Sequence, residues 1–173
     1  MIMHNYIIRT EKGNFIFNDD KAIRKETERA AKELNNNSVI PCKLLCKYTP
    51  KIHQNLIKNI KYFICNFMSY DYYGDGFALN FSGYPHDECD SYLTNIKISS
   101  KDYSILGIRI GDSINELDDK LIVYGYKRLA RKEFERKYVY KDGHVVIKCD
   151  EENGKIATVN VSVKTFYLGN RIY

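Results

Sequence analysis

The stretch "RKYVYKDGHVVIKC", residues 136–149, decides the fold that the sequence predicts. Apolar and polar residues alternate on both sides of Asp142-Gly143, and Asp-Gly between two such runs is a strong signal for a β-hairpin. A second turn, "ENGK" (152–155), leads into "IATVNVSV" (156–163). In that strand the residues expected to face the core are Ala157, Val159, Val161 and Val163. Residues 136–163 therefore predict an antiparallel meander.

The segment before the meander predicts an extended entry followed by a helix at 113–124. Asp112 or Ser113 is placed to cap that helix, and Gly125 is placed to end it in the left-handed conformation. Its apolar side is formed by Ile114, Leu117 and Leu121. Residues 126–131 predict a weak further strand, although the wider stretch 126–135 also fits a helix.

Residues 104–163 resemble a recurring bacterial unit of one helix followed by a four-stranded meander. The run from Gly107 through Gly111, Asp112 and Ser113 to Leu117 is similar to the opening of this unit in the superfamily of β-lactamase inhibitor protein and the small outer-membrane assembly lipoproteins. Uncharacterised proteins of low-GC Gram-positive bacteria carry similar segments. The resemblance implies a folding motif without catalytic residues, and a sheet that binds other proteins.

The rest of the chain completes an α+β prediction. A hairpin is expected at 5–10 and 14–18, and a helix at 20–34 with Ile23, Thr27, Ala30 and Leu34 on its apolar side. Thr49-Pro50 and an apolar repeat predict a second helix at 51–68. Strands are expected at 77–82 and 92–99, the latter with Tyr92, Thr94, Ile96 and Ile98 on one face. We predict one α+β domain over 1–173, an antiparallel sheet with amphipathic helices packed on one face, and a soft boundary near 69–76.

Composition narrows the class of protein. The net charge is +5, and 44% of the residues are hydrophobic, which is typical of a globular chain. No run approaches the roughly 18 apolar residues of a membrane span, and the start lacks the features of a signal peptide. Five cysteines without such a signal favour free thiols. We expect a cytoplasmic protein that does not contact a membrane.

Two acidic, tyrosine-rich segments, "YDYYGDG" (70–76) and "GYPHDECDSY" (83–92), predict a recognition surface. Tyrosine is favoured at interfaces because it offers a large contact area with little loss of entropy. An acidic patch with aromatic edges fits a protein partner with a basic surface. The predicted partner-binding residues are Tyr72, Tyr73, Asp75, Tyr84, Asp87, Glu88, Asp90 and Tyr92.

The segment 126–141 supports an alternative, the binding of nucleic acid or a nucleotide. Its cations would contact phosphate, and its tyrosines would stack on bases. The same charges also fit an edge strand that is protected from self-association. The predicted residues of this alternative are Lys127, Arg128, Arg131, Lys132, Arg136, Lys137, Tyr138 and Tyr140.

Metal and catalytic chemistry find little support in the sequence. The stretch His86–Asp90 is dense in metal-binding side chains, but five adjacent residues of a loop cannot all reach one ion. Cys42 and Cys46, with His53 and Cys65, form only one loose pair of the kind that zinc sites use twice. No catalytic or phosphate-binding motif is present. We expect no cofactor and favour a non-enzymatic binding module, such as an inhibitor, an immunity-type protein or a phage or mobile-element antagonist.

Overall fold

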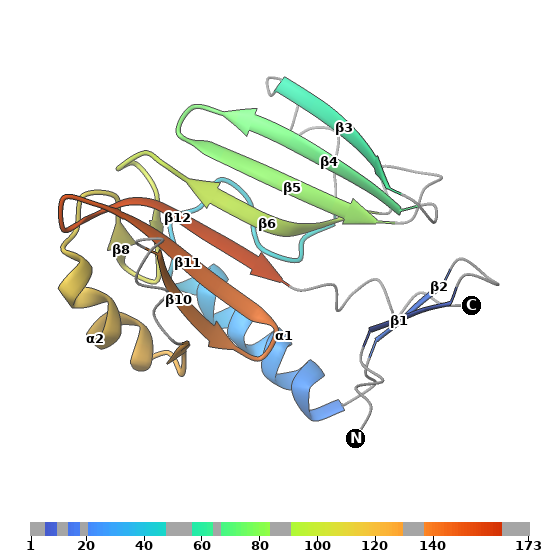
Figure 1. Cartoon of the computed structure of the whole chain (residues 1–173), viewed down its shortest axis with the longest axis horizontal. Helices are drawn as coiled ribbons and strands as arrows, with labels where there is room; N and C mark the ends of the chain where they lie inside the picture. Colours follow the sequence, from blue (N-terminus) through green and yellow to red (C-terminus); the bar gives the residue numbers. More distant parts are fainter. Residues whose placement is uncertain are drawn as a thin grey trace.

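The predicted hairpin on Asp142-Gly143 lies inside an eight-stranded antiparallel sheet (Figure 1). The computed structural model describes residues 6–9, 14–17, 21–47, 57–63, 67–83, 91–129 and 137–163. In spatial order the strands of the sheet are β3 (Ile57–Phe63), β4 (Phe67–Gly74), β5 (Phe77–Gly83), β6 (Tyr92–Ile98), β12 (Lys155–Val163), β11 (Val145–Glu152), β10 (Lys137–Asp142) and β9 (Lys127–Arg128). The chain is thus α+β with a mostly antiparallel sheet.

The remaining elements are short, apart from one helix. The predicted N-terminal hairpin is present as β1 (Tyr6–Arg9) and β2 (Asn14–Phe17), and β7 (Ser104–Ile105) pairs with β8 (Ile108–Arg109). The helices are α1 (Lys21–Asn36), the 3-10 helix η4 (Ile114–Glu116) and α2 (Leu117–Ile122). Two of them confirm the helices predicted at 20–34 and 113–124. Figure 1 shows α1 beside β10 and β11, which it contacts.

Local signals at the second helix behave as expected. Ser113 is the N-cap of η4, and its hydroxyl accepts a hydrogen bond from the backbone N–H of Asn115 at 3.3 Å. Gly125 follows α2 with a φ of +87°, a conformation that glycine adopts without a steric penalty. The predicted apolar side, Ile114, Leu117 and Leu121, is buried. The short strands β9 to β12 then follow as the expected meander.

The helix predicted at 51–68 is wrong. Residues 57–63 form strand β3, and β4 begins at Phe67 and runs through 69–74, where the sequence suggested a turn and a soft boundary. Residues 51–56 and 64–66 lie outside the described part of the chain. The apolar repeat every three to four residues fits a helix, but β-branched and aromatic residues are equally frequent in strands. Seven residue pairs between β3 and β4 make residues 57–63 a strand instead of a helix. This pairing depends on the tertiary structure and not on residues 57–63 alone.

A bulge in β12 changes which residues face the core. Asp150 pairs with Thr158 but Glu151 pairs with Ile156, so Ala157 has no partner in β11. Ile156 is therefore buried, and the prediction that Ala157 faces the core is wrong, because an inserted residue reverses the alternation. The other residues of that prediction are confirmed as buried, namely Val159, Val161 and Val163.

A second bulge has the same effect in β6. Asn80 pairs with Asn95 and Phe81 pairs with Leu93, which leaves Thr94 as the inserted residue. Leu93 is fully buried, whereas Tyr92, which pairs with Ser82, lies on the other side of the sheet. The predicted common face of β6 is thus correct for Ile96 and Ile98 and wrong for Tyr92 and Thr94.

Helix α1 is held against the turn between β10 and β11. The hydroxyl of Thr27, which is fully buried, accepts a hydrogen bond from the backbone N–H of His144 at 3.0 Å. Arg29 donates to the carboxylate of Asp142, which is nearly inaccessible to solvent. A Cβ added to Gly143 would lie 2.9 Å from the backbone nitrogen of Thr27. The turn therefore needs glycine both for its φ of +56° and for the close approach of α1.

Replacing Gly143 by Ala should lower the free energy of unfolding by roughly 2 to 4 kcal/mol, because the left-handed conformation and the contact with Thr27 both become unfavourable. The matched control is Gly154→Ala. Gly154 has a φ of +75° in another hairpin turn, but a Cβ there meets nothing within 4 Å. Urea unfolding should show a loss of only about 1 kcal/mol for this control. Equal losses in the two variants would contradict the tight contact with α1.

Two buried tyrosines differ in their hydrogen bonds. The hydroxyl of Tyr140 donates to Asp118 Oδ1 at 2.6 Å. No partner for the hydroxyl of Tyr126 is found among the described residues. Burial raises the pKa of both phenols above the usual range. A neighbouring carboxylate raises each pKa further: that of Asp142 beside Tyr126, and that of Asp118 beside Tyr140.

Tyr140→Phe should lower the free energy of unfolding by about 1 kcal/mol, whereas Tyr126→Phe should leave it unchanged or raise it. Since the folded state keeps both phenols protonated, stability should fall as the pH rises above about 10, where the unfolded chain loses these protons. Urea unfolding at pH 8 and pH 11 tests both points. A Tyr126→Phe variant with an unchanged pH dependence would contradict the expectation that the buried Tyr126 phenol contributes to the loss of stability at high pH.

Candidate binding surface

One side of the sheet is apolar and buried, and the other side is mainly polar, with the buried Val146 of β11 as an exception. Alternation along the strands places Tyr72, Leu79 and Ile96 in the core, and it places their neighbours Asp71, Asn80 and Asn95 on the opposite side. Residues that pair directly across strands point to the same side, so the register extends this side over the seven strands from β4 to β9. We call it the polar sheet face; its main residues are Asp71, Tyr73, Asn80, Asn95, Lys97, Lys127, Lys141, Lys148, Asn160 and Ser162.

Four lysines of this face follow the cross-strand rows. Lys97 of β6 pairs with Asn160, which pairs with Lys148 of β11. Lys141 of β10 pairs directly with Lys127 of β9. All four lysines are exposed, and no ion pair of theirs is found among the described residues. The half of the face from β6 to β9 is therefore basic.

Hydrogen bonds order the other half of the face. Asn80 donates through Nδ2 to Asp71 Oδ1 at 2.5 Å, and Ser82 donates to Asn80 Oδ1 at 2.9 Å. The hydroxyl of Thr94, on the β6 bulge, donates to Ser82 Oγ at 2.9 Å. These bonds hold the amide of Asn80 in one orientation. Beside them lies a shallow hollow of about 360 Å³, whose lining residues are Asp71, Tyr73, Ala78, Leu79, Asn80, Asn95, Lys97 and Asn160.

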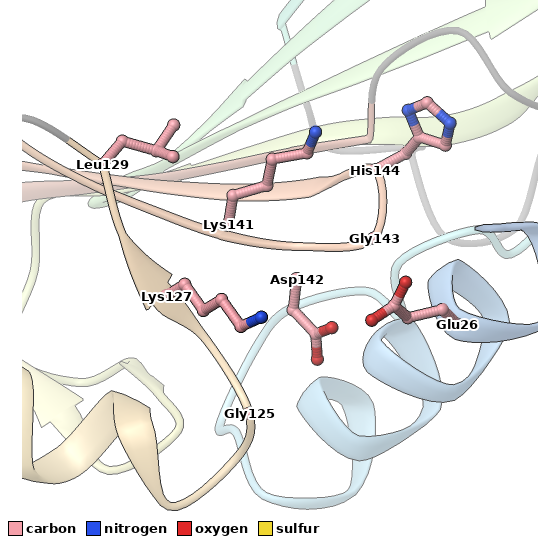
Figure 2. A pocket seen from close by; sticks show the side chains of 8 residues that line it. All are labelled: Glu26, Gly125, Lys127, Leu129, Lys141, Asp142, Gly143 and His144. Atoms are coloured by element: carbon pink, nitrogen blue, oxygen red, sulfur yellow. The ribbon is translucent and has the colours of Figure 1, made fainter.

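A second hollow, of about 290 Å³, lies at the basic end of the sheet (Figure 2). Figure 2 shows Lys127 of β9 and Glu26 of α1 reaching toward Asp142 from opposite sides. Burial raises the pKa of Asp142 and nearby Glu26 adds to this, whereas Arg29 acts in the opposite direction. The lining residues are Glu26, Gly125, Lys127, Leu129, Lys141, Asp142, Gly143 and His144.

The structure describes four of the eight residues of the predicted acidic surface, and these four lie at separate places. Tyr72 is buried in the core, where its ring meets Phe81 edge to face. Tyr73 is 42% exposed on the polar sheet face, and Asp75 is exposed in the β4–β5 turn. Tyr92 pairs with Ser82 at the opposite end of β5, about 17 Å along the strand from the β4–β5 turn. The remaining predicted residues are outside the described ranges: Tyr84, Asp87, Glu88 and Asp90.

The predicted stacking tyrosines of the basic segment are buried. Tyr140 is 1% exposed, and Tyr138, which is 7% exposed, donates to Glu151 Oε2 at 2.9 Å. Arg128 covers the Tyr138 ring at 5.3 Å from its centroid and pairs with Asp118 at 2.8 Å. The prediction that these rings stack on bases is therefore wrong for this structure. Lys127 does lie on the polar sheet face, whereas Arg131, Lys132, Arg136 and the side chain of Lys137 are not described.

Sequence reasoning missed Asn80, Asn95, Lys97, Lys148 and Asn160. Each stands at an outward position of a predicted strand, so alternation marks it as outside the core. Nothing local shows that these positions lie in the same rows, because the order β5-β6-β12-β11 brings together strands that are far apart in the sequence.

The described residues offer neither a metal-binding cluster nor a membrane-spanning helix. These contain no group of three or more His, Cys, Asp or Glu side chains able to hold a metal ion. Cys42 and Cys46 lie side by side, whereas His53, Cys65 and residues 86–90 are outside these ranges. Neither helix of the described part of the chain is long and apolar enough to cross a membrane.

Comparisons with known proteins give little further information. No protein-family model matches the chain, and no curated protein sequence matches it. Among solved structures, an extracellular protein containing an SCP domain from Bacillus anthracis str. Ames is similar with a TM-score of 0.41 and 8% sequence identity. The similarity covers 66% of this chain but only 42% of that protein. The resemblance of residues 104–163 to the β-lactamase-inhibitor-protein superfamily stays a prediction.

Lys141→Gln should slightly raise the free energy of unfolding, because it removes the repulsion between two lysines that pair directly across β9 and β10. The matched control is Lys155→Gln, which should lower it, since Lys155 pairs with Glu152. Both effects should shrink in 1 M NaCl. Urea unfolding at low and high salt measures them, and a loss of stability for Lys141→Gln at low salt would contradict the repulsion.

Proposed function

We propose that this protein is a non-enzymatic protein-binding module, of the inhibitor, immunity or phage-antagonist kind, that uses its polar sheet face. The observation that carries the proposal is a set of four exposed lysines on four of the five consecutive strands from β6 to β9, namely Lys97, Lys127, Lys141 and Lys148. Like charges on neighbouring strands destabilise a sheet, so an uncompensated set of them favours a role outside folding.

The geometry of the lysines suits an extended acidic surface. Strands lie about 4.8 Å apart, so the lysines from β6 to β9 span roughly 20 Å. The amides of Asn95 and Asn160 lie beside them and offer donors and acceptors of hydrogen bonds. Charges arranged in this way speed association with a partner of opposite sign. We therefore propose a protein partner with an acidic surface, in place of the basic partner that the sequence predicted.

We also propose that α1 and α2 both pack on the apolar side of the sheet, which leaves the polar sheet face open. The support is that residues of both helices belong to one buried cluster with the strands, among them Ala30, Leu34, Leu117, Leu121, Ile147 and Val159. The resemblance of residues 104–163 to proteins that bind partners through their sheets favours the same surface.

Binding of nucleic acid or a nucleotide is the second candidate. Lys127 and Lys141 line the same hollow and are suited to phosphate. The burial of Tyr138 and Tyr140 weighs against this candidate, because base stacking contributes much of the affinity of proteins for single strands. We therefore favour the protein partner.

The test is affinity purification from extracts of the native host after nuclease treatment. The bait is compared with a triple variant of the face, Lys97→Gln, Lys141→Gln and Lys148→Gln. The control triple variant, Lys25→Gln, Lys32→Gln and Lys101→Gln, makes the same change in net charge at exposed positions elsewhere. We expect the recovered partner to bind the face variant roughly tenfold more weakly and the control nearly as well as the natural chain.

Equal weakening in both triple variants would contradict the role of the face, because only net charge would then matter. Binding that nuclease abolishes, or binding of single-stranded oligonucleotides with a steep salt dependence, would support the second candidate instead.

A further inference from the structure

The segment 41–47 forms a tight turn that ties α1 to the sheet. Asn35, near the end of α1, donates through Nδ2 to the carbonyl of Leu44 at 3.0 Å and accepts from its N–H at 2.7 Å. Leu45 donates to the carbonyl of Leu93 in β6, and Leu93 donates to the carbonyl of Cys46, both at 2.9 Å. The turn is thus hydrogen-bonded to both α1 and β6, and its Leu44 side chain is buried.

This turn brings two thiols together. Cys46 donates its backbone N–H to the carbonyl of Lys43 at 3.1 Å, and Leu45 adopts a φ of +65° that allows the chain to reverse. As a result, Cys42 Sγ and Cys46 Sγ lie 2.9 Å apart. Cys42 is buried at 7% exposure, whereas Cys46 is half-buried and opens toward the surface.

We propose that Cys42 and Cys46 form a redox modification site, in which hydrogen peroxide or a related hydroperoxide converts the dithiol into an intramolecular disulfide. The proposal rests on the distance between the sulfur atoms and on the backbone bonds that hold the turn. It is independent of the partner-binding function proposed above, because the turn is not part of the polar sheet face.

The two cysteines have different parts in this reaction. The hydrogen bond between the two sulfur atoms, in which either thiol can be the donor, and the backbone N–H of Lys43 hold the pKa of Cys42 below its usual range. The same hydrogen bond, together with burial, raises the pKa of Cys46. Cys42 is therefore the thiolate that attacks.

The reaction balances in two steps. The Cys42 thiolate attacks one peroxide oxygen, the O–O bond breaks, and Cys42 becomes a sulfenic acid while hydroxide leaves. The sulfur of Cys46 then attacks the sulfenic sulfur, the S–O bond breaks, and water leaves as the disulfide forms. Overall the two thiols lose two protons and two electrons, and one hydrogen peroxide becomes two waters.

The sequence offers a direct readout. Lys43 lies between the two cysteines, so trypsin places Cys42 in the peptide 33–43 and Cys46 in the peptide 44–47. After brief exposure of the native protein to a small excess of hydrogen peroxide, non-reducing mass spectrometry should find these peptides linked, with the loss of two hydrogens. Dithiothreitol should separate them. Cys149 should stay reduced, since it is fully buried and burial raises its pKa to about 12.

Variants assign the order of the steps. Cys46→Ser should stop at the sulfenic acid, which dimedone traps on the peptide 33–43. Cys42→Ser should give no dimedone adduct on the peptide 44–47, and protein unfolded in urea should lose the preference for this pair. Failure of the two peptides to link in the native protein would overturn the proposal. It would equally be overturned by stoichiometric zinc in protein purified without chelators, if that zinc protects both thiols from peroxide.

Discussion

The rest of the structure depends on the contact between Thr27 of α1 and the turn at Gly143. The turn joins β10 to β11 in the middle of the meander, and more than a hundred residues separate it from the helix. Because only a glycine lets the two backbones approach so closely, the helix can occupy one place on the sheet. Asp142 and Arg29 reinforce this place with a partly buried charge pair. The apolar side of α1 then closes the core over β10 and β11.

Because one side of the strands faces that core, the alternating side chains between the core residues form the other side, which is mainly polar. This side combines an ordered network around Asn80 with lysines whose charges no described residue neutralises. The network rigidifies the half of the face near β4 and β5, and the lysines dominate the half near β9 to β11. Only Lys127 and Lys141 are directly opposite each other, and Lys127 lies on the edge strand β9, where a lysine also protects the edge from pairing with another chain. The partner binding proposed above would use this arrangement.

Much of the fold could be predicted from short stretches. The turn at Gly143, the cap at Ser113 and the end of the helix at Gly125 depend on neighbouring residues alone, and all three are present. Ile57–Phe63 shows the limit, because its apolar residues suit a helix or a strand until pairing with β4 decides. The bulges at Thr94 and Ala157 could not be predicted from their own segments either, because a bulge is defined by the pairing with the neighbouring strand. For the same reason the candidate site was predicted only in part: Lys127 and Tyr73 lie on it, whereas Tyr138 and Tyr140 turned out to be core residues.

The sequence by itself determined the strand alternation, the turns, the helix ends and the spacing that lets Cys42 and Cys46 meet in one turn. These features arise from interactions over a few residues, so they are encoded locally. Only the tertiary structure decided that β12 lies between β6 and β11, and hence that Lys97, Asn160 and Lys148 form one row. The physical reason is that strand order and register are set by the burial of side chains from distant segments in a common core, and no short stretch contains that information.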